Sequence, residues 1–257
     1  MKFQRRQILK NMVASFVGIA MSKYAFSHTV QKIQQQAKKA DDRNDKIGIV
    51  NAGIGGNNTV DLLNRIDKDC LSYHPKLTIL MGGTNDMNSI KHVPLGQYRQ
   101  NLTQLISKIK DSGSEVLLMT ILPAYEPYLL TRHPAAFYLP EGVAGRRKQV
   151  NDVIKAVAEK NEIHLLDIGQ RFADIGKIGL DKDSLIQNEA NTNKTDGIHP
   201  TPNGYRFIAL SVYDYMCDHG LPGSNIVCFG DSITHGDGSL DKESYPAYLL
   251  KLLTHSN

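Results

Sequence analysis

An alternation of short apolar runs with amphipathic stretches is the feature that most constrains this fold. The apolar runs are four to six residues long and lie at Ile47–Val50, Leu77–Met81, Val116–Ile121, Ile163–Ile168 and Ile226–Phe229. Runs of this length bounded by Gly or Pro predict buried strands, and the stretches between them carry apolar residues at helical spacing. The pattern therefore predicts a three-layer α/β/α sandwich, in which helices cover both faces of a mostly parallel sheet of about five strands.

Polar clusters follow several of these predicted strands. Right-handed crossovers bring the C-terminal ends of parallel strands to one edge of the sheet, where ligands bind. Gly56, Asn85 and Ser232 each lie in a cluster that directly follows a strand. A fourth cluster, Asp196 with His199, lies on a long polar loop that we expect to leave the same edge. We therefore expect these residues to converge in space.

The converging residue types suit nucleophilic catalysis. A serine hydroxyl is a weak nucleophile at neutral pH and needs an adjacent base, a task that suits imidazole. Asp196 can fix the tautomer of His199 and stabilise the imidazolium that forms. The carbonyl oxygen under attack becomes negative and needs fixed hydrogen-bond donors, which the Gly56 N–H and the Asn85 amide can supply. Together the clusters predict a serine hydrolase.

Each cluster also has a simpler interpretation when it is taken alone. The alternatives are a helix cap at Ser232, a tight turn or weak phosphate cradle at Gly55-Gly56, a cap of the following helix by Asn85 and Asp86, and a plain turn at Asp196-Gly197. The occurrence of all four at one predicted edge favours the catalytic interpretation.

The clusters resemble the four sequence blocks of the SGNH hydrolases, also called the GDSL esterase/lipase family. The matching stretches are Gly230–Thr234, Asn51–Gly56, Gly83–Asp86 and Asp196–Pro200. The second is the loosest, because Gly55 and Asn57 stand where the family commonly has a serine and an aspartate. The resemblance covers nearly all of the chain after residue 45.

The resemblance implies specific roles for the residues of these blocks. Ser232 would be the nucleophile, with His199 and Asp196 completing the catalytic triad. The oxyanion hole would be formed by Gly56, Asn85 and the backbone N–H of Ser232. The implied fold has a flavodoxin-like sheet, and no metal or organic cofactor is implied.

The order of the blocks departs from the usual family member. The serine block normally comes first, whereas Ser232 here follows His199 and lies near the end of the chain. This order predicts a circular permutation in which the former ends are joined near Leu221–Gly223. Permutation is tolerated when the termini are close and the new cut falls in an exposed loop.

The first 27 residues have the layout of an export signal. Basic residues precede an apolar stretch from Met12 to Met21, and small residues follow near Ala25–Ser27. Arg5-Arg6 resembles a twin-arginine signal, although an amphipathic first helix is the alternative. We therefore expect residues 1–27 to be an export signal peptide, residues 28–45 a linker or frayed helix, and residues 46–257 the hydrolase domain, located in the periplasm or secreted.

The charge and the cysteines exclude other classes of protein. Residues 1–27 hold five basic and no acidic side chains, so removing them takes the formal charge from +4 to −1. The basic chain is thus no evidence for nucleic-acid binding. No apolar stretch is long enough for a stable membrane span. Cys70, Cys217 and Cys228 have no metal-binding spacing.

The predicted substrate is a carboxylic ester, small or carried on a carbohydrate, with a short acyl group such as O-acetyl. A lysophospholipase or thioesterase, and an inactive carbohydrate-binding protein on the same fold, are the alternatives; a metal-dependent hydrolase using Asp196, His199 and Asn85 is more remote. The insert of residues 124–147 is rich in Pro and aromatic residues. It predicts either a lid or binding loop, or a packed surface excursion. The sequence leaves the oligomeric state open.

Overall fold

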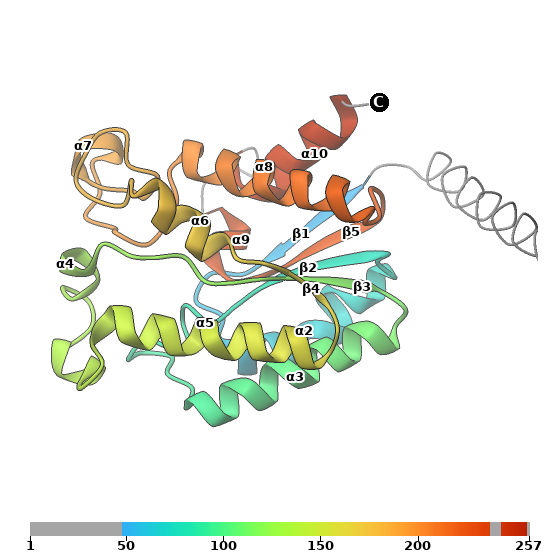
Figure 1. Ribbon diagram of the computed structural model, residues 1–257, viewed down its shortest axis with the longest axis horizontal. Helices are drawn as coiled ribbons and strands as arrows, with labels where there is room; N and C mark the ends of the chain where they lie inside the picture. Colours follow the sequence, from blue (N-terminus) through green and yellow to red (C-terminus); the bar gives the residue numbers. More distant parts are fainter. Residues whose placement is uncertain (1–47, 237–242, 256–257) are drawn as a thin grey trace, which may run out of the picture. The chain divides into compact units, whose positions relative to one another are not determined.

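The computed structural model describes residues 48–236 and 243–255. The predicted signal peptide (1–27) and the predicted linker (28–45) lie outside these residues. Figure 1 shows a central sheet with helices on both of its faces. The strands are β1 (Ile49–Gly53), β2 (Leu77–Met81), β3 (Glu115–Met119), β4 (His164–Leu166) and β5 (Ile226–Gly230). All four strand pairings are parallel, as predicted.

Two groups of helices cover the sheet, and each buries its own hydrophobic cluster. The first group consists of α2 (Thr59–Asp69), α3 (Leu95–Asp111) and α5 (Gly142–Lys160). The second consists of α6 (Ile168–Ile175), α8 (Pro202–His219) and α10 (Tyr245–His255). Short elements complete the described chain: η1 (Leu71–Tyr73), α4 (Glu126–Leu129), η2 (Ala135–Tyr138), α7 (Glu189–Thr192) and α9 (Ser232–His235).

The last strand of the chain lies in the interior of the sheet. The strand order is β1-β5-β2-β3-β4, and every residue of β5 is buried. If β5 is counted first, the order becomes 2-1-3-4-5, which is the flavodoxin-like order. The parallel register places Gly230 beside both Gly53 and Met81. The segments that follow β1, β2 and β5 therefore leave the sheet at the same level.

Strand boundaries differ from the sequence prediction most clearly at β1 and β4, while β3 ends at Met119 instead of Ile121. We expected the first strand at Ile47–Val50, but β1 continues to Gly53 because its pairing with β5 extends to Gly230. We also expected the fourth strand to continue to Ile168. The strand instead ends at Leu166, and the Asp167 side chain accepts a hydrogen bond from the N–H of Gln170, which caps α6. Helix α6 lies where a loop was predicted.

Close backbone packing holds β1 against α9. A Cβ atom added to Gly53 would lie 2.2 Å from the backbone nitrogen of His235 and 2.7 Å from its Cα. The Asn51 side chain strengthens this contact, since its amide donates to the His235 carbonyl at 3.2 Å. Only a residue without a side chain fits at Gly53.

The substitution Gly53→Ala tests this packing. We expect it to lower the free energy of unfolding by about 1–3 kcal/mol or more, because backbone atoms of α9 must move. The melting temperature would then fall by roughly 2–4 °C per kcal/mol. The control is Gly96→Ala in α3, where an added Cβ meets nothing within 4 Å and stability should be unchanged or higher. Equal effects of the two substitutions in thermal denaturation would contradict the packing argument.

Candidate active site

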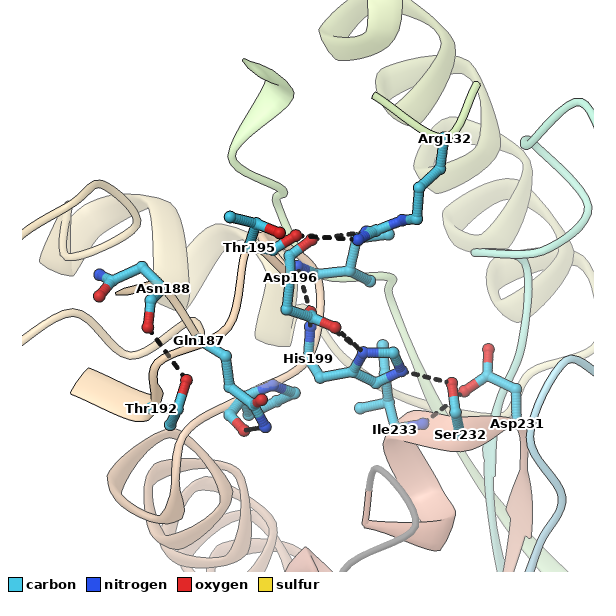
Figure 2. A network of polar contacts seen from close by, with 12 residues as sticks. Arg132, Gln187, Asn188, Thr192, Thr195, Asp196, His199, Asp231, Ser232 and Ile233 are labelled. Atoms are coloured by element: carbon cyan, nitrogen blue, oxygen red, sulfur yellow. Dashed lines mark hydrogen bonds and ion pairs between the residues drawn. The ribbon is translucent and has the colours of Figure 1, made fainter. Parts of the chain in front are cut away.

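Ser232, His199 and Asp196 form a hydrogen-bonded chain across the edge of the sheet (Figure 2). The Oγ of Ser232 lies 2.8 Å from Nε2 of His199. Nδ1 of His199 lies 2.9 Å from Oδ2 and 3.1 Å from Oδ1 of Asp196. A carboxylate can only accept a hydrogen bond, so Nδ1 carries the proton and Nε2 is left to accept from the serine hydroxyl. The three residues thus have the geometry of a nucleophile, its base and the group that orients the base.

The loop that carries Asp196 and His199 is built around the Asp196 carboxylate. Asp196 Oδ1 accepts hydrogen bonds from the N–H of Ile198 at 2.8 Å and from the N–H of His199 at 2.6 Å. Arg132 donates to the Asp196 carbonyl at 2.5 Å and to the Thr195 carbonyl at 3.1 Å. The same carboxylate therefore shapes the turn and orients the imidazole.

The hydrogen bonds to Asp196 also keep it ionised. Burial acts to raise its pKa, but the hydrogen bonds and charge of His199, with the N–H groups of His199 and Ile198, outweigh burial and lower the pKa to about 2. A carboxylate that stays charged at neutral pH is what an imidazolium formed at His199 requires.

Asp231 fixes the backbone that presents Ser232. Its Oδ1 accepts from the N–H of Ile233 at 2.9 Å, which caps α9. The side chain is 1% exposed, and Oδ2 has no hydrogen-bond partner among residues 48–236 and 243–255. Burial raises the pKa of Asp231 to about 6, against the lowering effect of the Ile233 N–H and of His199.

Gly56 and Asn85 lie on the same edge as Ser232. An added Cβ on Gly55 would lie 3.9 Å from the Cβ of Ser232, so the Gly55-Gly56 turn adjoins the serine. Gly56 has a positive φ of 75°, which favours glycine. The Asn85 amide donates to the carbonyl of Asn57 at 2.9 Å, directly after that turn. The structure therefore brings together all five residues that the sequence singled out.

Arg65 is a site residue that the sequence analysis missed. Its Nε donates to Asn57 Oδ1 at 2.6 Å, and its Nη2 donates to the Gly230 carbonyl at 2.8 Å. Its guanidinium also stacks over Phe229, 4.4 Å from the ring centre. Arg65 therefore ties the Gly55–Asn57 turn to the strand that presents Ser232. In the sequence, Arg65 looks like an ordinary charged residue on the surface of the amphipathic helix α2, so no pattern indicated this role.

Asp86 joins its own block to the start of helix α2 and does not cap the helix that follows it. Its carboxylate accepts from the N–H of Thr59 at 3.0 and 3.2 Å and from the Thr59 hydroxyl. The proposed cap of the following helix is therefore wrong for Asp86, because Thr59 lies at the start of α2.

Within the part of the chain that the structure describes, no group of three or more His, Cys, Asp or Glu side chains could hold a metal ion.

The insert of residues 124–147 forms one wall of a pocket beside the triad. The Tyr125 N–H donates to the Gly197 carbonyl at 2.8 Å, so the insert is attached to the histidine loop. The lining residues are Thr84, Met87, Asn88, Leu122, Pro123, Ala124, Glu126, Leu129, Val143, Ala144, Arg147, Ile198 and Ile233. Thr84, Ile198 and Ile233 are sequence neighbours of Asn85, His199 and Ser232. The insert thus lines this pocket together with neighbours of the candidate site residues.

Comparison with known families supports a hydrolase. A model described as the GDSL-like lipase/acylhydrolase family matches residues 24–207. An uncharacterized lipoprotein of Bacillus subtilis (strain 168), YqeF, is 31% identical over 181 residues, which cover 65% of this chain and 73% of that protein. An arylesterase of Vibrio mimicus is 24% identical over 173 residues, covering 67% of this chain and 72% of that protein.

Solved structures share the fold. An acetyl xylan esterase superposes with a TM-score of 0.53 at 23% identity, covering 71% of this chain and 88% of that chain. A lipase/acylhydrolase from Enterococcus faecalis superposes with a TM-score of 0.50 at 20% identity, covering 64% of this chain and 72% of that chain. At these identities the likeness concerns the fold.

The substitution Arg65→Met tests the tie between the turn and β5. We expect kcat on an aryl ester to fall by roughly tenfold or more with little change in KM, because the turn that carries Gly56, a predicted oxyanion donor, would move. Arg65→Lys should recover part of the loss, since one ammonium can reach one of the two acceptors. The control, Arg99→Met, changes an exposed residue of α3. A KM effect with unchanged kcat would rule out this positioning role.

Asp231→Asn should change how stability depends on pH. The pKa of Asp231 is raised by folding from an ordinary value near 3.8 to about 6. The contribution of protonated Asp231 to the free energy of unfolding is therefore complete below about pH 4 and is lost as the pH rises through 6. Asn keeps the helix cap but does not ionise. In chemical denaturation, the free energy of unfolding of the variant relative to that of wild type should increase by up to about 3 kcal/mol between pH 4 and pH 8.

The exposed Asp111→Asn variant is the control for this measurement. If the free energies of unfolding of wild type and Asp231→Asn change in parallel between pH 4 and pH 8, the raised pKa of Asp231 is wrong.

Proposed function

The chain belongs to the GDSL-like lipase/acylhydrolase family and is a hydrolase of ester bonds, and on that basis we propose that it is a serine esterase that forms an acyl-enzyme. The observation that carries the proposal is the 2.8 Å contact between Ser232 Oγ and His199 Nε2. The hydrogen bond between His199 Nδ1 and Asp196, on the opposite side of the same ring, also supports the proposal.

The reaction proceeds in two steps. Ser232 Oγ attacks the ester carbonyl carbon while His199 Nε2 takes the hydroxyl proton, and the alcohol leaves with that proton. A water molecule then attacks the acyl-enzyme, again giving its proton to His199, and the acid leaves as Ser232 regains its hydrogen. The Gly56 N–H, the Asn85 amide and the Ser232 N–H stabilise the negative oxygen in both steps.

The pocket beside the triad supports a short acyl group. Its buried floor is formed by apolar side chains, among them Leu122, Leu129 and Ile233. Its volume is about 70 Å³, well below the roughly 150 Å³ of an engineered cavity that binds benzene. We propose acetyl or a similarly short group, carried on a carbohydrate. Lysophospholipase and thioesterase activity are the alternatives for longer or different esters.

Export and permutation are further parts of the proposal. The basic, apolar and small-residue segments of residues 1–27 support an export signal, and a relative is named a lipoprotein. In the described part of the chain, no helix has the length and hydropathy of a membrane span. A circular permutation is supported by the interior position of β5 and by a family match that ends before Ser232.

Labelling with a fluorophosphonate probe tests the nucleophile. We expect wild type to be labelled, and Ser232→Ala to lose the label and roughly 10⁶-fold in kcat. In a series of 4-nitrophenyl esters, kcat/KM should be highest for acetate and fall beyond butyrate. Absence of label together with absence of short-chain ester cleavage would favour an inactive binding protein, and a preference for long acyl chains would favour the lipase alternative.

A further inference from the structure

Two oppositely charged side chains line the pocket beside the triad and have no hydrogen-bond or ion-pair partner in the described part of the chain. Glu126, at the start of α4, and Arg147, in α5, are both partly exposed. Neither side chain has a hydrogen bond or an ion pair with any residue of 48–236 or 243–255. We call Glu126 and Arg147 the rim of the pocket.

Glu126 and Arg147 line the same pocket, and the Glu126 carboxylate acts electrostatically on the Arg147 guanidinium. Burial lowers the pKa of the Arg147 guanidinium, while the carboxylates of Asp167 and Glu126 act to raise it. Asp167 already has partners, since it pairs with Lys155 at 2.5 Å and accepts from Thr120 at 2.8 Å. Glu126 is therefore the carboxylate that shares the pocket with Arg147 and has unused hydrogen-bonding capacity.

The chemistry of this pair restricts what can bind beside it. An anionic ligand meets repulsion from Glu126, and a cationic ligand meets repulsion from Arg147. A hydrocarbon would bury both groups without partners, which is costly. A hydroxyl group both donates and accepts, so neighbouring hydroxyls satisfy the acceptor Glu126 and the donor Arg147 together.

A third polar group at the pocket points the same way. The Thr84 hydroxyl is buried and lacks a hydrogen-bond partner in the described part of the chain, and Thr84 lines the pocket next to Asn85. A mainly apolar pocket with a few unpaired polar groups is typical of a specific ligand site. The apolar floor suits the acyl group and the polar rim suits the rest of the ester.

We propose that Glu126 and Arg147 select esters whose alcohol part carries free neighbouring hydroxyls, as a partly acetylated sugar does. This inference depends on the esterase function proposed above and assigns the recognition of the alcohol part to the rim. The two residues act as specificity-determining residues and take no part in the bond changes at Ser232.

Two acetate esters of similar size separate rim recognition from catalysis. Methyl 2-O-acetyl-β-xylopyranoside has two free hydroxyls on its ring, and cyclohexyl acetate has none. For Arg147→Met and Glu126→Met we expect kcat/KM to fall at least about tenfold on the xyloside, mainly through KM, because a hydrogen bond to a charged group is lost. Activity on cyclohexyl acetate should not fall and is expected to rise, because its hydrocarbon ring no longer covers an unpaired charge.

The matched control is Lys148→Met, which alters an exposed side chain that pairs with Asp152 on α5. Equal losses on both esters would show that the rim residues serve folding or catalysis and would overturn the inference. The inference also fails, while the esterase proposal stands, if wild type cleaves cyclohexyl acetate and not the xyloside, or prefers lysophosphatidylcholine. Failure to cleave any ester, with no fluorophosphonate label, would instead refute the proposed function.

Discussion

The parallel pairing of β5 with both β1 and β2 is the constraint on which the site depends. Because Gly230 lies beside Gly53 and Met81, three chain segments leave the sheet at one level. Ser232 follows the middle strand, the Gly55-Gly56 turn follows one neighbour, and Asn85 follows the other. A one-residue change of register would turn the buried side chains of β5 to the opposite face and remove this alignment.

Polar side chains then convert strand alignment into a fixed site. Arg65 joins the Asn57 side chain to the Gly230 carbonyl, and Asp86 joins the third block to the start of α2. On the other side of Ser232, the Asp196 carboxylate holds both its own turn and the imidazole of His199. Arg65 and Asp86 connect segments far apart in the sequence, and the contact between His199 and Ser232 does the same, so the tertiary fold positions these side chains.

Local patterns predicted most of the fold because burial leaves a clear periodicity. The apolar runs marked all five strands, and the polar residues after them marked Ser232, His199, Asp196, Gly56 and Asn85. Boundaries were less accurate where pairing or capping decided them. Strand β1 reaches Gly53 because β5 lies beside it, and β4 ends at Leu166 because Asp167 caps helix α6.

The sequence by itself determined the fold class and the set of chemical groups available for an ester hydrolysis, since hydrophobic period and residue type are local properties. Only the tertiary structure decided the partners of Arg65, the role of Asp86 and the meeting of Glu126 with Arg147 at one pocket. A charged side chain on a helix looks the same in sequence whether it faces solvent or a neighbouring strand. Its partner is set by which elements pack together, and that depends on contacts between distant segments.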